Sequence, residues 1–131
     1  MSRRYLLDTH VVLWWLHSDR KLGRRTRDLI DGHDCAVSVV TLFELLAKNA
    51  AGKLPLPEGP VAEQIEAFGF RLLSLTAAHV ASGAALFGLH PDPFDCLLMG
   101  VARSEPRTLL TRDAQLLERA GNLLGDLIAE A

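Results

Sequence analysis

Four acidic residues stand at points where a fold of alternating strands and helices would bring them together. Asp8 directly follows a short apolar run, and Asp113 lies just after another. Asp95 falls in the first turn and Glu44 in the second turn of segments with helical patterning. Carboxylates that share a site repel one another unless a cation neutralises them. The four residues are therefore candidate metal ligands and candidate catalytic groups.

The ligand chemistry predicts a hard metal ion. Oxygen ligands without neighbouring cysteine or histidine partners favour Mg²⁺ or Mn²⁺ over Zn²⁺. Such an ion can lower the pKa of a bound water, orient it and stabilise charge on a phosphoryl oxygen, which indicates phosphodiester hydrolysis. Thr9 and Thr111 flank two of the acids, and their hydroxyls could orient a carboxylate or a metal-bound water. The sequence contains no P-loop and no G-x-G-x-x-G turn, which disfavours an ATPase or a dinucleotide enzyme.

Each of these side chains also has a structural explanation. Asp8 and Asp113 could cap the helices that follow them, and Glu44 could pair with a lysine four positions on. Asp92 and Asp95 stand at the cap and third positions of a helix that opens with proline, so both suit a helix N-terminus. The cap explanation fits Asp92 better than a role in the site, and local capping is also the commoner use of threonines.

The elements that would position the acids alternate along the chain. Strands are predicted at 5–7, 35–38, 70–75 and 108–110, and helices at 10–17, 20–31, 39–49, 61–68, 76–86, 93–104 and 113–120. Residues 52–60 contain two glycines and three prolines and are predicted to form a loop, while 121–131 suit either a terminal helix or a short edge strand. This alternation predicts a mainly parallel sheet covered on both faces, with ligands bound beyond the carboxyl ends of the strands.

Composition indicates an ordinary globular protein. The 131 residues suit one domain spanning 1–131, without room for a separate RNA-binding module or an antitoxin. Hydrophobic residues make up 49% and charged residues 23%, which excludes a disordered or collagen-like chain, and the net charge of −2 neither supports nor excludes a nucleic-acid partner. Four large apolar residues, which are Trp14, Trp15, Leu16 and Phe43, are expected to be mostly core.

The sequence also predicts a cytoplasmic location without a membrane span. Cys35 and Cys96 lack the spacing of zinc ligands, which fits a reducing compartment. Asp8 and His10 interrupt the first apolar run before it could form the core of a signal peptide. The longest later apolar stretch falls well short of the roughly 20 residues that a transmembrane helix needs.

The segments around the four acids resemble those of the PIN-domain ribonucleases, in particular the VapC-type toxins of bacterial toxin–antitoxin pairs. The resemblance runs from Tyr5 to about Leu117 and rests on segments 6–16, 38–56, 90–95 and 110–113, of which the third reads H-x-D-P-F-D. Two departures are Pro91 and Cys96, which stand where the family often has arginine.

This resemblance implies a fold, a site and partners. The fold would be a PIN-like three-layer α/β/α domain whose mainly parallel central sheet has four or five strands. Asp8, Glu44, Asp95 and Asp113 map onto the metal-binding acids of the family, with Thr111 beside them. The protein would be a Mg²⁺- or Mn²⁺-dependent endoribonuclease, a homodimer, and a toxin inhibited by a cognate antitoxin. Exposed apolar side chains could receive the antitoxin or a second subunit.

An RNA substrate requires positive charge, and five basic residues crowd into eight positions. They are Arg20, Lys21, Arg24, Arg25 and Arg27. These residues could steer the phosphate backbone toward the acidic pocket, or they could form a solvated helix face. Two other functions stay open at the level of sequence: a catalytically silent PIN-like binding module, which four intact acids argue against, and a related nuclease that cleaves DNA.

Overall fold

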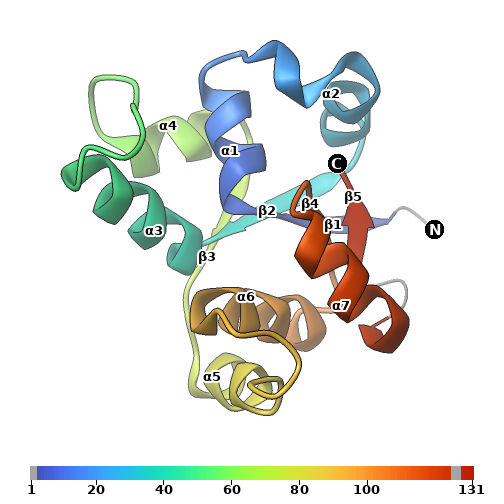
Figure 1. Cartoon of the computed structure of the whole chain (residues 1–131). Helices are drawn as coiled ribbons and strands as arrows, with labels where there is room; N and C mark the ends of the chain where they lie inside the picture. Colours follow the sequence, from blue (N-terminus) through green and yellow to red (C-terminus); the bar gives the residue numbers. More distant parts are fainter. Residues whose placement is uncertain (1–2, 125–127) are drawn as a thin grey trace.

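Short apolar segments form the strands of one parallel sheet in the computed structural model, which describes residues 3–124 and 128–131 (Figure 1). The strands in the described residues are β1 (Arg4–Leu7), β2 (Asp34–Ser38), β3 (Arg71–Leu73), β4 (Thr108–Thr111) and β5 (Ile128–Glu130). Their order is β3-β2-β1-β4-β5, and all neighbours are parallel. The chain adds strands on one side of β1 up to β3 and then returns to the other side with β4. The order therefore reverses between β1 and β4, which is where open sheets bind ligands.

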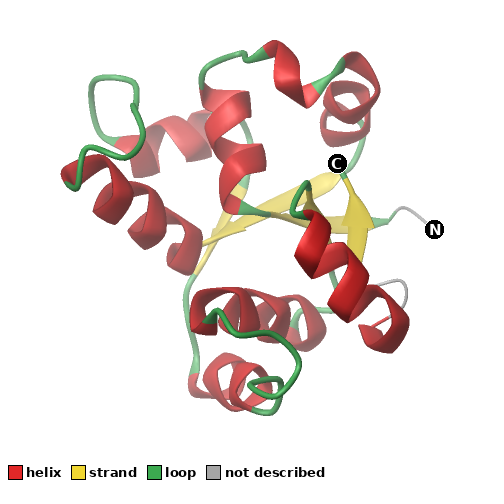
Figure 2. Ribbon diagram, viewed as in Figure 1, coloured by secondary structure: helices red, strands yellow, loops and turns green. Residues whose placement is uncertain are grey.

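Helices cover both faces of the sheet (Figure 2). They are α1 (Thr9–Leu16), the 3₁₀ helix η1 (Arg20–Leu22), α2 (Arg24–Asp31), α3 (Val39–Ala50), α4 (Val61–Ala67), α5 (Ala77–Ala84), α6 (Pro93–Ser104) and α7 (Ala114–Leu124). Side chains alternate across a strand, so Tyr5 and Leu7 of β1 join the core beneath α1 to α4, and Leu6 joins the core beneath α6 and α7. The predicted three-layer α/β/α fold with a parallel sheet is confirmed.

Two glycines let α5 and α6 touch through their backbones. A Cβ atom at Gly100 of α6 would lie 2.3 Å from the backbone nitrogen of Gly83 in α5, and a Cβ atom at Gly83 would lie 2.8 Å from the Cα of Leu97. No side chain fits between helices at these distances. The crossing therefore depends on glycine at both positions, and it holds the helix that carries Asp95.

A buried arginine joins the strands at the edge of the sheet opposite the acids. Arg107, at the start of β4, is 1% exposed. Its Nη1 donates to the carbonyl of Tyr5 at 3.1 Å and to the carboxylate of Asp34 at 3.0 Å. The amino ends of β1, β2 and β4 are thus held together by a charge-assisted contact.

The structure differs from the predicted elements at a few boundaries. The single helix predicted at 20–31 is divided by Gly23, whose positive φ of 77° ends η1 before α2 begins. The strand predicted at 70–75 is shorter, and of the two alternatives for the last residues the edge strand is present as β5. Phe43 was expected in the core but is 62% exposed, so that prediction was wrong, while Trp14, Trp15 and Leu16 are half-buried against the core. No helix in the described residues is long and apolar enough to cross a bilayer.

Candidate active site

Asp8 and Asp113 follow neighbouring strands at the reversal point of the sheet. Asp8 directly follows β1, and its backbone N–H donates to the carbonyl of Leu110 in β4 at 3.0 Å. Asp113 follows β4 and precedes α7. Because parallel strands end at the same edge, the two acids share one side of the molecule, as their positions in the sequence predict.

Asp8 is a buried carboxylate held by two threonines. It is 7% exposed, accepts a hydrogen bond from the backbone N–H of Thr9 at 2.7 Å, and accepts another from the hydroxyl of Thr111 at 2.5 Å. Burial raises the pKa of Asp8, the negative charge of Glu44 adds to this effect, and the bonds from Thr111 and Thr9 oppose it. The site therefore fixes this carboxylate in place and at the same time leaves its charge without full compensation.

Glu44 reaches the same region from α3. The hydroxyl of Thr9 donates to its carboxylate, and the Nζ atom of Lys48 lies 3.7 Å from its Oε2 atom. The ion pair with the lysine one turn away, which sequence offered as an alternative to a role in the site, is thus present together with a contact to Thr9 beside Asp8. Thr9 links the two acids because its backbone serves Asp8 and its hydroxyl serves Glu44.

Asp95 lies in the first turn of α6 and interacts with a histidine. The Nε2 atom of His90 is 2.8 Å from the Oδ2 atom of Asp95. Burial, followed by the negative charges of Asp92 and Asp8, raises the pKa of Asp95 to about 6, while the hydrogen bond and charge of His90 oppose the rise. Asp8 and Asp95 therefore repel each other across the site.

Asp113 both caps a helix and lines a pocket. Its Oδ1 atom accepts from the backbone N–H groups of Gln115 at 2.9 Å and Leu116 at 3.1 Å, and its own N–H donates to the Thr111 hydroxyl at 3.1 Å. Thr111 thus bridges Asp113 and Asp8. A pocket of about 270 Å³ is lined by Asp8, His10, Trp14, Arg112 and Asp113.

Asp92, the acid three positions before Asp95, caps α6. The Oδ1 atom of Asp92 accepts from the backbone N–H groups of Phe94 and Asp95 at 2.8 and 3.3 Å, which is the capping role that its position before Pro93 predicts. Its charge still acts on Asp95. Asp92 therefore influences the site electrostatically while its side chain is occupied by the backbone of α6.

The acids suit a cation, although they do not form a finished coordination shell. Within residues 3–124 and 128–131, no three His, Cys, Asp or Glu side chains are grouped closely enough to hold an ion as they stand. The raised pKa values of Asp8 and Asp95, each increased by another carboxylate, show excess negative charge at this edge. A divalent cation with oxygen ligands would relieve this repulsion, so the residues present fit Mg²⁺ or Mn²⁺.

The five basic residues of segment 20–27 lie in two different parts of the surface. Arg20 and Lys21 are exposed in η1, and this helix contacts the acidic pocket because the Nη2 atom of Arg112 donates to the carbonyl of Leu22 at 3.2 Å. Arg24 is exposed at the start of α2, and Arg27 is half-buried and donates to the carbonyl of Asp19 at 2.6 Å.

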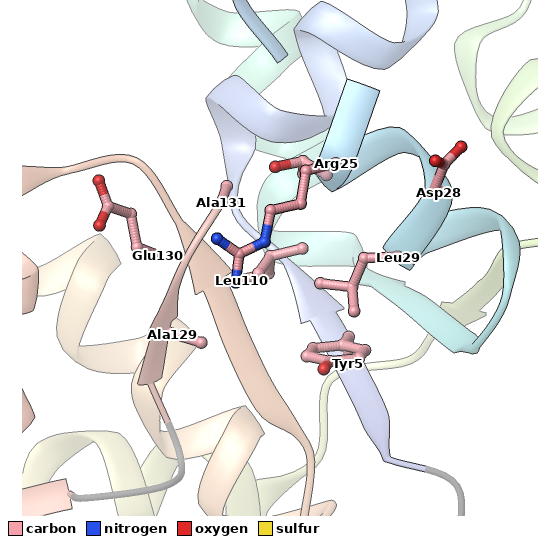
Figure 3. Close-up of a pocket in the computed structure, with 9 residues that line it drawn as sticks. Tyr5, Arg25, Asp28, Leu29, Leu110, Ala129, Glu130 and Ala131 are labelled. Atoms are coloured by element: carbon pink, nitrogen blue, oxygen red, sulfur yellow. The ribbon is translucent and has the colours of Figure 1, made fainter. Parts of the chain in front are cut away.

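Arg25 extends instead into a separate cavity of about 820 Å³ (Figure 3). Its lining includes Tyr5, Asp28, Leu110 and Glu130, and none of the four predicted site acids. The structure therefore places η1 against Arg112 at the rim of the acidic pocket and Arg25 in a separate cavity.

Sequence reasoning missed two features of this region. It assigned no role to His90, which contacts Asp95, although the histidine of H-x-D-P-F-D was a visible signal. It also missed Arg112, whose guanidinium lies 5.3 Å from the ring centroid of Trp14 and whose Nε donates to the carbonyl of Ala131 at 2.7 Å. Cys96, the departure from the family pattern noted in the sequence, is buried.

Comparison with known proteins agrees with the fold and the resemblance in sequence. A model of the PIN domain matches residues 5–122. Ribonuclease VapC22 of Mycobacterium tuberculosis is 31% identical over 115 residues, which cover 85% of this chain and 88% of that protein. The tRNA(fMet)-specific endonuclease VapC of Shigella flexneri is 30% identical over 128 residues, which cover 92% and 94%.

Solved structures share the fold. A chain of the DNA-bound VapBC structure from Salmonella typhimurium aligns with a TM-score of 0.67 and 21% identity over 99% of this chain and 98% of that chain. This structure agrees with the family model and the two relatives on the fold of the domain. The protein belongs to the PIN-domain family and, within it, to the VapC ribonucleases.

Proposed function

We propose that this protein is a Mg²⁺- or Mn²⁺-dependent endoribonuclease that acts as the toxin of a toxin–antitoxin pair. The observation that carries the proposal is the arrangement of the acids at the reversal point of the sheet: Thr111 bridges Asp8 and Asp113, Thr9 joins Asp8 to Glu44, and the charge of Asp8 acts on Asp95. The names of its relatives, a ribonuclease and a tRNA-specific endonuclease, support RNA as the substrate class.

The site residues divide into those that would hold the ion and those that orient them. Asp8, Asp95 and Asp113 would hold it, and Glu44 would complete the pocket or orient a water. When bound, the ion supplies Lewis-acid stabilisation of the phosphoryl oxygen and lowers the pKa of a water. Thr111 holds one oxygen of Asp8, and the hydroxyl of Thr9 holds Glu44.

The deciding experiment measures cleavage of matched RNA and DNA strands with Mg²⁺, with Mn²⁺ and with EDTA. The proposal requires RNA cleavage with a divalent ion and its loss in EDTA. Preferential cleavage of DNA would support the alternative nuclease. Absence of both cleavage and divalent-ion binding, with a partner still bound tightly, would establish a silent binding module instead.

Divalent ions are expected to stabilise the protein at neutral pH and much less at pH 5. The pKa of Asp95 is raised to about 6, so below that pH a proton competes with the ion for its carboxylate. An ion at about 100 times its Kd adds about 2.7 kcal/mol to the free energy of unfolding. Thermal unfolding at pH 7.5 and pH 5, with MnCl₂ or with NaCl of equal ionic strength, measures the difference.

In the ion-free protein, Asp95 makes the free energy of unfolding depend on pH in the opposite direction. Because the pKa of Asp95 is higher in the folded state than its ordinary value of 3.8, its contribution to stability is present below pH 4 and is lost as pH rises through about 6. An Mn²⁺-induced rise in melting temperature of the same size at both pH values would contradict the assignment of Asp95 as a ligand.

Removing the exposed charges of η1 is expected to weaken RNA binding. The double variant Arg20→Gln/Lys21→Gln should raise KM and leave kcat largely unchanged, because η1 lies beside the pocket without reaching its acids. Each lost phosphate contact should reduce the slope of log K against log salt concentration by about 0.7 for a single strand. KM measured at several salt concentrations tests this, with Arg103→Gln/Arg119→Gln on α6 and α7 as the charge-matched control. An equal slope in both double variants would show that η1 is only a solvated surface.

We propose a cytoplasmic protein that binds a cognate antitoxin and forms a homodimer. Both cysteines are buried and unpaired, which suits a reducing compartment.

Phe43 of α3 and Phe94 of α6 stack with their ring centroids 6.4 Å apart, and they are 62% and 42% exposed. This exposed aromatic pair supports a protein contact on this face. Growth during expression, with and without the small open reading frame expected beside the gene, tests the toxin role, and light scattering tests the dimer.

A further inference from the structure

His90 is a buried histidine whose ring contacts a proposed metal ligand. It lies in the connection between α5 and α6, is 5% exposed, and places its Nε2 atom 2.8 Å from the Oδ2 atom of Asp95. A carboxylate accepts hydrogen bonds, so the Nε2 atom carries the proton and donates. The proton position on this ring is therefore determined by its partner.

The second ring nitrogen of His90, Nδ1, does not explain why a histidine stands at this position. Within the described part of the chain, the Nδ1 atom of His90 is buried without a hydrogen-bond partner. A buried polar atom without a partner is destabilising, because it has lost its hydrogen bonds to water. An apolar side chain would avoid this penalty, so the contact with Asp95 is the polar interaction that the imidazole provides here.

The backbone of His90 is fixed to the helix that carries Asp95. The Sγ atom of Cys96 lies 3.2 Å from the carbonyl oxygen of His90 and 3.4 Å from that of Leu86, and it can donate to both. Cys96 directly follows Asp95 in α6. The ring and the carboxylate therefore belong to one small rigid unit.

The orientation of the Asp95 carboxylate depends on the His90 ring more than the orientation of any other site acid depends on a single residue. Thr111 and the Thr9 N–H hold Asp8, the Thr9 hydroxyl holds Glu44, and the backbone of α7 holds Asp113. For the carboxylate of Asp95, His90 is the donor, and the described residues supply no other.

We infer that His90 is a positioning residue of the nuclease site, which fixes one oxygen of Asp95 and leaves the other available to the metal ion. The inference rests on the proposed function. His90 does not touch the substrate or the ion and acts through the orientation of Asp95. Losing such an outer partner typically weakens metal affinity or activity by about 10- to 100-fold.

The test compares variants that keep or remove the donor. His90→Gln retains an N–H donor on a side chain of similar reach, whereas His90→Phe retains a buried ring without one. We expect His90→Phe to raise the Kd for Mn²⁺ by about 10- to 100-fold and His90→Gln to remain several-fold closer to the parent. Mn²⁺ binding is measured by calorimetry and by the loss of the free-ion electron paramagnetic resonance signal, and RNA cleavage is measured at limiting and saturating Mn²⁺.

The chain offers a matched control at a second buried histidine. The Nε2 atom of His79 also lies 2.8 Å from a carboxylate oxygen, that of Glu105, and His79 is 3% exposed. It belongs to the capping box of α5, outside the acidic site. His79→Phe should therefore lower the melting temperature without changing the Kd for Mn²⁺.

The outcomes separate this inference from the proposed function. An unchanged Kd and unchanged cleavage in folded His90→Phe would overturn the positioning role while the nuclease function stands. A parent protein that binds no Mn²⁺ would overturn the metal-dependent function itself, and this inference with it. If His90→Phe does not fold, His90→Met replaces it, because methionine fills irregular gaps without supplying a donor.

Discussion

Replacing Asp8 with asparagine is expected to abolish RNA cleavage and to leave the protein as stable as the parent or more stable. The carboxylate is 7% exposed and its pKa is raised by burial, so the folded protein holds a poorly solvated charge. Asparagine has the same shape, can accept from the Thr9 N–H through its carbonyl, and can donate to the Thr111 hydroxyl. The contact with the Thr9 N–H is therefore kept and the contact with Thr111 is kept with its direction reversed, while the charge that a cation needs is lost.

The loss of activity in Asp8→Asn should exceed the loss caused by removing a residue that only orients a metal ligand. Such partners typically account for about 10- to 100-fold, so Asp8→Asn should reduce kcat/KM by more than about 100-fold. Single-turnover cleavage at saturating Mn²⁺ measures it, and thermal unfolding measures stability with and without the ion. Asp31→Asn, an exposed acid at the end of α2, is the matched control. Parental cleavage by folded Asp8→Asn protein would refute the metal assignment.

Two alanine substitutions at helical glycines are expected to change stability in opposite directions. At Gly100 the new methyl would lie 2.3 Å from the nitrogen and 2.6 Å from the Cα of Gly83, so α5 and α6 would have to separate. Overpacking of this kind is destabilising by about 3 kcal/mol or more, because backbone atoms cannot rotate away as a flexible side chain can. At Gly121 of α7 no atom of the described residues lies within 4 Å, and alanine should stabilise the helix by about 0.5–1 kcal/mol.

Urea denaturation of the two variants and the parent checks the signs. Gly100→Ala should also weaken Mn²⁺ binding, because α6 carries Asp95 and the crossing with α5 fixes its position. Gly121→Ala should leave metal binding unchanged. Equal stability of the parent and Gly100→Ala would mean that the two helices are not in backbone contact in solution.

The alternation of patterns was sufficient to predict most of this fold. Mostly apolar runs of three to six residues, separated by helical segments, predicted β1, β2, β3 and β4, because strands buried on both faces are apolar along most of their length. The division at Gly23 was missed because the charged pattern continues through it, and only the positive φ of 77° interrupts the helix. The terminal strand was ambiguous because a three-residue edge strand is stabilised by its pairing with β4, which sequence does not display.

The site was predictable as a set of acids but not as a network. Asp8 and Asp113 could be placed together because strand ends meet at one edge in a parallel sheet. The contact of His90 with Asp95 depends on how the α5–α6 connection folds back, and the exposure of Phe43 depends on which helix face meets the sheet. No local sequence pattern indicates either feature, because both depend on tertiary packing rather than on hydrophobic periodicity.

The reversal of strand order also determines when the site can form during synthesis. The Thr111 hydroxyl reaches Asp8 from 103 positions later in the chain, and β1 lacks its second neighbour until β4 has been made. A ribosome adds residues from the N-terminus at roughly 5–20 per second, so the early strands wait several seconds for their partner. A chain that ends before residue 108 carries Asp8, Glu44 and Asp95 without β4, the strand that pairs with β1 and supplies Thr111. The nascent chain therefore cannot complete the acidic site until β4 has been made and has paired with β1.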